Sequence, residues 1–176
     1  MPDMDANNTE KGTISICFVE EALRGIRQRG FDCNALLLQA GISPELLSSP
    51  QARVSSTHYG QRWHGIAQTL DDEFFGMDSH RMKAGSFTLL CHTLIHSDSL
   101  ERALRRALRF LGLVLDDMAG ELHCEAGVAR IVLRDTGAAA PKRAFAYGTY
   151  LLILHGLACW LVGRRIPVLR ADFRCP

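Results

Sequence analysis

Apolar residues three and four positions apart predict several short helices in the first part of the chain. Residues 16–26 follow this spacing, with Ser15 as the N-cap and Gly30 where a left-handed residue ends a helix. A second helix begins after its predicted cap, Asp32, and a third opens with Pro44 at its first helical position, where the missing N–H costs nothing. The pattern therefore indicates a helical start to the fold.

The middle of the chain predicts two more helices separated by an aromatic turn. Residues 55–70 form the first helix, and residues 74–77 (Phe-Phe-Gly-Met) form a turn with two large anchors. Residues 85–95 are short and apolar on all sides, so periodicity alone decides neither for helix nor for strand. We predict a helix, because a strand leaves Gly85 and Ser86 unexplained.

The clearest helix begins at Asp98, which we predict as the N-cap in a capping-box-like pair with Glu101. Its apolar residues form one stripe, and four arginines lie off that stripe: Arg102, Arg105, Arg106 and Arg109. Such an arginine face is typical of a solvated surface, and it could also receive an anionic ligand or an acidic partner. Arg106 and Arg109 have a further explanation that needs no ligand, because the helix dipole favours cations in the C-terminal half of a helix.

After this helix the hydrophobic period changes from helical to alternating. Residues 122–125 and 129–134 alternate as strands do, with a hairpin turn between them, and residues 166–173 predict a third strand. With about five or six helices and about three strands, the class is α+β. We expect a mainly helical domain with a small antiparallel sheet of about three strands packed on a long buried helix.

That long helix is predicted over residues 144–162, after a loop of small residues at 137–141. It carries no formal charge over 19 residues and has basic residues on both sides. This length approaches that of a membrane span, but its interior holds Tyr147, Thr149 and His155. We predict the central buried helix of a domain; a membrane span and an exposed dimer face are the alternatives.

Composition places the chain among cytoplasmic globular proteins. Its 176 residues predict one regulatory domain over residues 13–176, after a disordered tail at 1–12. A formal charge of +1 gives no field for phosphate-backbone binding, so this chain is not expected to hold nucleic acid by itself. Six cysteines without a CxxC pair, and a polar N-terminus without a signal peptide, predict free thiols in a reducing cytoplasm.

Catalytic and metal-binding patterns are weak. His92 and His96 stand at i and i+4, a spacing that a metal site can use, but no third ligand is placed. We therefore interpret them as core or surface histidines rather than metal ligands. Ser86 follows Gly85 without the residues of a nucleophile elbow, and no phosphate-binding glycine motif is present. We expect no enzyme, no metal and no cofactor.

Several short segments of the sequence, taken in their order along the chain, fit a known pattern. They are residues 29–32 (Arg-Gly-Phe-Asp), 36–37, 40–42, 46–47, 53–55, 72–77 (Asp-Glu-Phe-Phe-Gly-Met), 85–87, 99–100, 103–104 and 109–110. Together they resemble the N-terminal arabinose-binding-like regulatory domain of AraC/XylS-family transcriptional regulators, in the subgroup that includes ornithine- and arginine-responsive activators. The resemblance runs from about Ile16 to the end.

This resemblance implies a cytoplasmic bacterial transcription regulator in which this domain senses a small effector and forms a homodimer. DNA would be bound only through a separate C-terminal helix-turn-helix domain that this chain lacks, so we expect a domain truncated at its C-terminal end, without a membrane partner. A scaffold for oligomerisation without a small ligand is the alternative. Effector pockets are apolar with a few polar groups, and the candidates for lining one are Trp63, Phe87, His92, Tyr147, Tyr150 and His155.

Overall fold

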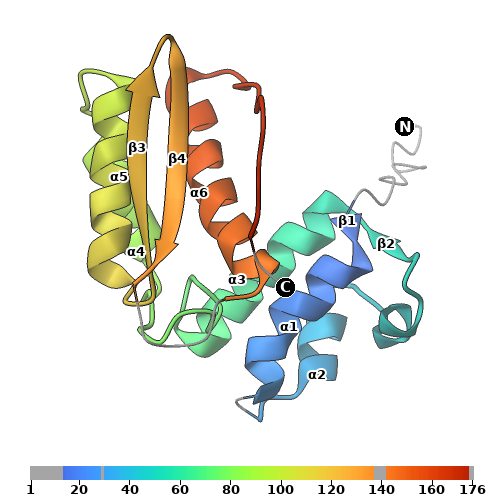
Figure 1. Cartoon of the computed structure of the whole chain (residues 1–176). Helices are drawn as coiled ribbons and strands as arrows, with labels where there is room; N and C mark the ends of the chain where they lie inside the picture. The colour runs from blue at the N-terminus through green and yellow to red at the C-terminus, as the bar shows by residue number, and fades with distance from the viewer. Residues whose placement is uncertain (1–13, 29, 137–141, 175–176) are drawn as a thin grey trace, which may run out of the picture. The chain divides into compact units, whose positions relative to one another are not determined.

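A computed structural model describes residues 14–28, 30–136 and 142–174 (Figure 1). The chain divides into two compact units, Met1–Thr69 and Leu70–Pro176, each with its own internal contacts. The predicted tail at 1–12 and the predicted loop at 137–141 lie outside the described residues. Whether both units belong to one regulatory domain stays a prediction.

The first unit is helical, as its sequence pattern predicts. Its elements are β1 (Ile14–Ser15), α1 (Ile16–Gln28), α2 (Cys33–Gln39), the 3-10 helix η1 (Pro44–Ser48), β2 (Arg53–Val54) and α3 (Ser56–Leu70). The carboxylate of Asp32 caps α2 by accepting the N–H groups of Asn34 and Ala35. The two-residue strands β1 and β2 pair antiparallel, which the sequence did not indicate.

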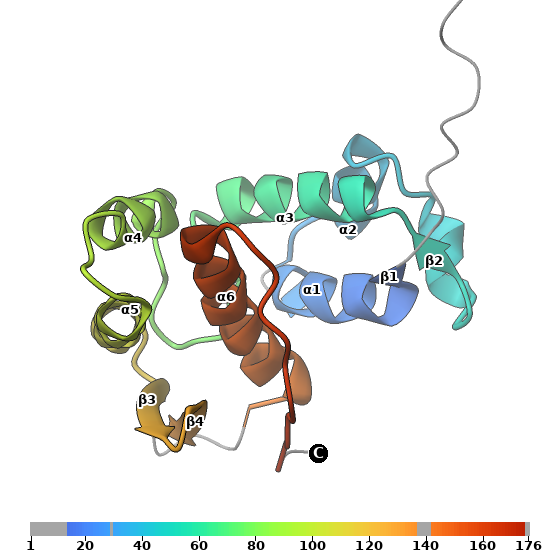
Figure 2. The same cartoon turned by 90° about the horizontal axis from the view of Figure 1, so that it is seen from above.

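The described residues of the second unit form three helices and a β-hairpin. Its elements are α4 (Ser86–Leu94), α5 (Leu100–Val114), β3 (Met118–Glu125), β4 (Val128–Asp135) and α6 (Ala144–Val162). Ala126 and Gly127 form the two-residue turn of the hairpin, both with positive φ, 49° and 77°, which matches the twist of the strands. α5 packs against α4, β3 and α6 and is the centre of this unit (Figure 2).

The core of the second unit forms where α5, α6 and the inner face of the hairpin meet. α5 buries one stripe of its surface, and Met118 and Leu122 of β3 are buried against the same cluster. Phe74 and Met82 from the segment before α4 complete it, both almost fully buried. The predicted role of the residue 74–77 turn as an anchor is therefore confirmed.

Two carboxylates bind the backbone of the segment that precedes α4. Asp72, which is 1% exposed, accepts the N–H groups of Phe74 (3.0 Å), Gly76 (2.8 Å) and Met82 (3.1 Å). Glu73 accepts the N–H groups of residues 85 and 87 and so binds the N-terminal end of α4. These bonds satisfy backbone donors that a non-repetitive segment would otherwise leave without partners.

A second pair of carboxylates joins this segment to the connection between α5 and β3. Asp78 accepts the N–H groups of Asp116 (2.9 Å) and Asp117 (3.0 Å), and Asp117 accepts both the N–H (2.8 Å) and the hydroxyl (2.7 Å) of Ser79. Lys142 forms an ion pair with Asp117. These hydrogen bonds lower the pKa of the Asp117 carboxyl, with the lysine as the largest cause and burial opposing it.

The N-terminus of α5 differs from its prediction by one residue. Ser99 is the N-cap, and its hydroxyl accepts the N–H of Arg102 at 3.2 Å. Asp98 lies one position further out and forms an exposed ion pair with the Arg102 side chain instead. Both residues favour N-caps, and periodicity alone does not fix a boundary to one residue.

The predicted strand at 166–173 is wrong, so the sheet that the described residues of this unit form has two strands rather than about three. The segment after α6 is not paired with a strand. Instead, the N–H of Ile166 donates to the Cys159 sulfur at 3.3 Å, and the Ile166 carbonyl lies 2.8 Å from Nε2 of His155. Side chains of α6 thus take up the backbone groups of Ile166 that a sheet ladder would use.

α6 has the predicted bounds but buries only one side. Tyr150, Leu154 and Leu157 are buried, whereas Leu152 is 66% exposed and Trp160 is 53% exposed. In length and composition α6 could cross a membrane, but a single such helix is weak evidence because core helices of soluble proteins share both properties. The expectation of a helix buried all round is therefore corrected to a half-buried helix.

Replacing Asp72 with Asn tests the role of the first carboxylate. Asp72→Asn keeps the size of the side chain but turns one acceptor oxygen into a donor facing backbone N–H groups. We expect the free energy of unfolding to fall by about 1–3 kcal/mol, measured by urea denaturation. Asp98→Asn, at an exposed ion pair, is the control and should change it by less than about 0.5 kcal/mol. Equal midpoints for the two variants would contradict this role.

The lowered pKa of Asp117 predicts a pH-dependent contribution to stability. A carboxyl whose folded pKa lies below its ordinary value of 3.8 stabilises the fold above that value and loses this contribution as pH falls through the folded pKa. We therefore expect Asp117→Asn to be less stable than wild type at pH 6, and this gap to shrink below about pH 4. Thermal unfolding across this range measures it. Asp116→Asn, on the exposed neighbour, is the control; a constant gap for Asp117→Asn would be the contrary result.

Candidate functional site

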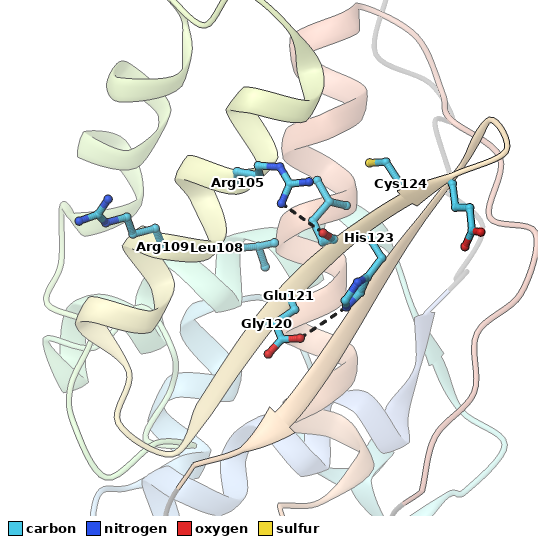
Figure 3. Close-up of a pocket in the computed structure, with 9 residues that line it drawn as sticks. Arg105, Leu108, Arg109, Gly120, Glu121, His123 and Cys124 are labelled. Atoms are coloured by element: carbon cyan, nitrogen blue, oxygen red, sulfur yellow. Dashed lines mark hydrogen bonds and ion pairs between the residues drawn. The ribbon is translucent and has the colours of Figure 1, made fainter.

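An open groove of about 770 Å³ lies between α5 and β3 in the second unit (Figure 3). Arg105, Leu108 and Arg109 line it from α5, and residues 120–125 line it from β3. Glu125 pairs with Val128 next to the hairpin turn. From that pair on, every second residue of β3 directs its backbone N–H and C=O groups away from β4, because hydrogen-bonded and non-hydrogen-bonded pairs alternate in an antiparallel ladder. The groove therefore follows the unpaired edge of a strand beside a helix.

The charged residues of the groove differ in whether they have hydrogen-bond or ion-pair partners. Arg105 bonds Glu101 at 3.0 Å and donates to the carbonyl of Leu122 at 3.3 Å, so it joins α5 to the strand edge. Glu121 accepts from Arg134 at 3.2 Å. Arg109 has no ion pair or side-chain hydrogen bond within the described residues, and its guanidinium points away from the strand in Figure 3.

Tyr150 of α6 lies behind this groove with an unusual hydroxyl group. The residue is fully buried, its ring packs edge-on against Phe74 with the ring centres 6.5 Å apart, and within the described residues its hydroxyl has no hydrogen-bond partner. Burial raises the pKa of Tyr150 to about 12. The hydroxyl therefore stays protonated at neutral pH and is available as a donor.

Gly120 brings the groove and the Tyr150 hydroxyl close together. A Cβ atom at this position would lie 2.5 Å from Cδ2 of Leu108 and 3.1 Å from the hydroxyl oxygen of Tyr150. Any residue other than glycine would therefore force these side chains apart. Gly120 and Leu108 both line the groove, and Cδ2 of Leu133 on β4 lies 3.1 Å from the same Cβ position.

The other two candidates on α6 make structural contacts. The Tyr147 hydroxyl donates to Asp135 at 2.6 Å and accepts the N–H of Lys142 at 3.0 Å, so it joins the hairpin to the start of α6. A carbonyl only accepts, so the contact of His155 with Ile166 requires a proton on Nε2. Both side chains are engaged in holding the fold.

The six sequence candidates do not surround one cavity. Phe87 and His92 are exposed on α4, and Trp63 belongs to α3 in the first unit, where its side chain lies outside the described residues. None of the six is among the residues that line the groove. Their role in ligand binding stays a proposal, and the geometry singles out Tyr150 among them.

Comparison with known proteins identifies the family of the chain. The sequence model of the family described as "Arabinose-binding domain of AraC transcription regulator, N-term" matches residues 30–176. The chain belongs to this family. It is also 25% identical over 173 residues to the ornithine utilization regulator of Pseudomonas aeruginosa. The match covers 93% of this chain and 48% of that protein, so the chain spans about half the length of this curated relative. No solved structure matches it.

Membership in this family confirms the resemblance found in the sequence and places the chain in transcription regulation. A regulator family points away from an enzyme. Within the described part of the chain, no three His, Cys, Asp or Glu side chains lie close enough together to hold a metal ion.

The sequence indicates one wall of the groove but not the other. Its pattern marks the arginine face of α5 as a possible anion site, whereas it marks β3 only as a strand. The alternation of Glu121, His123 and Glu125 was a usable signal, because residues two apart share a strand face. Nothing in the sequence marked Gly120, whose role depends on the packing of Leu108 and Tyr150.

Proposed function

We propose that this chain is the effector-sensing part of a cytoplasmic transcription regulator. In this role it binds a small molecule and transmits its binding state to a DNA-binding part of the regulator. Family membership over residues 30–176 carries the proposal. The groove between α5 and β3 supports it, because it offers concave space with a few polar groups on an ordered unit.

The chemistry of the effector is only loosely indicated by the relative. Its name connects that protein with ornithine utilization, but a protein can change its ligand while keeping its fold. We therefore propose a small metabolite as the class and do not transfer the individual compound. DNA binding is assigned to the remainder of the regulator, in keeping with the formal charge of +1 here.

A thermal-shift screen of the purified chain tests this function. The panel contains amino acids, sugars and fatty acids, each added at a saturating concentration. A ligand at 100 times its Kd stabilises the folded state by about 2.7 kcal/mol, so we expect at least one compound to raise the unfolding temperature. If no compound of any class raises it, the chain does not sense these metabolites and the proposal fails.

Dimerisation is a second proposed function, favoured by the exposed side of α6. Gly148, Leu152, Gly156 and Trp160 lie four residues apart along it, and Leu152 and Trp160 are more than half exposed. Residues at this spacing share one face of a helix. Such a face suits a two-fold interface, in which the same patch serves both copies.

Light scattering after size exclusion tests this second function. We expect a dimer for the wild-type chain and a monomer for Leu152→Glu and Trp160→Glu, because a buried unpaired carboxylate would oppose association. Leu113→Glu is the matched control, since Leu113 is 75% exposed on α5. A wild-type monomer at high concentration, or dimers for both α6 variants, would exclude this interface.

A further inference from the structure

β3 is paired along only one of its two edges among the described residues. Its partner is β4, and the groove follows the other edge. On that edge the carbonyl of Leu122 accepts from Arg105 at 3.3 Å, so Leu122 directs its backbone groups outward. Because every second residue of an antiparallel strand does so, Gly120 and Cys124 direct theirs outward as well. An edge of this kind is a template for a further strand.

The segment after α6, residues 167–173, has the pattern of a strand but no strand partner among the described residues. Extended as a strand, it would place three apolar side chains on one face: Leu169, Ala171 and Phe173. The opposite face would carry the charged side chains of Arg170 and Asp172. Leu169 is 79% exposed and Phe173 is 48% exposed, so the apolar face is uncovered in a single copy.

The groove matches both faces of this segment. Leu108 and Leu122 line the groove and belong to the hydrophobic core, so the apolar face of an added strand would extend that core. On the other face of β3, Glu121 and Glu125 are exposed carboxylates. Arg170 of an added strand would lie beside them, and opposite charges on neighbouring strands attract.

The free edge of β4 suits this segment less well. Arg130 and Arg134 pair with the residues two positions to either side of Glu121, so both arginines share its face of the hairpin. Arg170 on that edge would meet two positive charges instead of two carboxylates. The charges therefore favour the edge of β3.

Within one copy this segment does not reach the groove. In Figures 1 and 2, α6 lies between the segment and α5, and β4 lies between the segment and β3. The start of the segment is also fixed, because Ile166 is bonded to His155 and Cys159 of α6. A second copy of the chain can present the same segment to the groove from outside.

We propose that, in a dimer of this chain, residues 168–173 of each copy pair as a strand with the free edge of β3 in the other copy. The apolar face of the segment covers the groove, and its charged face lies beside the carboxylates of β3. Arg105 does not prevent this pairing, because a carbonyl oxygen has two lone pairs and that of Leu122 can accept a second hydrogen bond. The proposal rests on the proposed dimerisation and adds a contact beyond the exposed face of α6.

Amide hydrogen exchange, followed by NMR on the complete 176-residue chain, tests the pairing. The rates are measured at low and high protein concentration, and sedimentation gives the fraction of dimer in each sample. We expect the outward N–H groups of Gly120, Leu122 and Cys124 to exchange at least about tenfold more slowly in the dimer, because pairing protects them. Unchanged rates at these positions in a dimer would overturn the proposal. Slowing confined to Ile131 and Leu133 would also overturn it, because it would place the segment on β4.

Two neighbouring lysine substitutions separate the faces of the segment. Leu169→Lys puts a charge on the face that pairing buries, so the Kd of the dimer should rise by about tenfold or more and the slowing on β3 should disappear. Val168→Lys is the matched control: Val168 is 62% exposed and belongs to the other face, so Kd should stay within about twofold or fall. An equal rise in Kd for both variants would contradict the assignment of the faces.

Two further measurements separate this contact from folding and from dimerisation itself. Both lysine variants should unfold at the wild-type temperature in dilute samples, where the chain is monomeric, because both positions are exposed there. A dimer that Leu152→Glu abolishes but Leu169→Lys leaves unchanged would overturn the strand pairing and leave the α6 interface standing. A wild-type chain that stays monomeric at high concentration would remove the proposed dimerisation and this contact together.

Discussion

The arrangement of the second unit depends on buried carboxylates that accept backbone N–H groups. Each of the two carboxylates accepts hydrogen bonds from the segment that carries the other. Asp78 accepts N–H groups from the connection between α5 and β3, and Asp117 accepts the N–H and the hydroxyl of Ser79. Each ionised carboxylate would be unstable in the core without these donors. Because the donors belong to segments 38 and 39 residues apart in sequence, satisfying the charge also fixes the two segments against each other.

This constraint determines the geometry of the groove. α5 and β3 are its two walls, and residues 116–117, which Asp78 holds, form the connection between them. Arg105 fixes the walls a second time through the carbonyl of Leu122.

Local patterns predicted the helices well because each has its own periodicity and cap. α6 has the predicted bounds, and the hairpin turn stands where Glu125 and Gly127 indicated it. The strand predicted at 166–173 failed because alternation shows only that a segment could be extended. In the structure, side chains of α6 take up the backbone groups of Ile166. The groove was beyond prediction for the same reason: Gly120 and Tyr150 are 30 positions apart in sequence, and only the packing of α6 beside β3 relates them.

The arginines of α5 show how the fold uses most of one charged face for contacts within the structure. In the sequence the four residues were equivalent, and a solvated surface explained them as well as an anion site. In the structure Arg102 pairs with Asp98, Arg105 with Glu101 and Leu122, and Arg106 with the Ser97 hydroxyl at 3.1 Å. These pairs are exposed and contribute little to stability individually, but they occupy three guanidinium groups. Arg109 is left, among the described residues, as the arginine of this face whose hydrogen-bonding capacity the fold does not use.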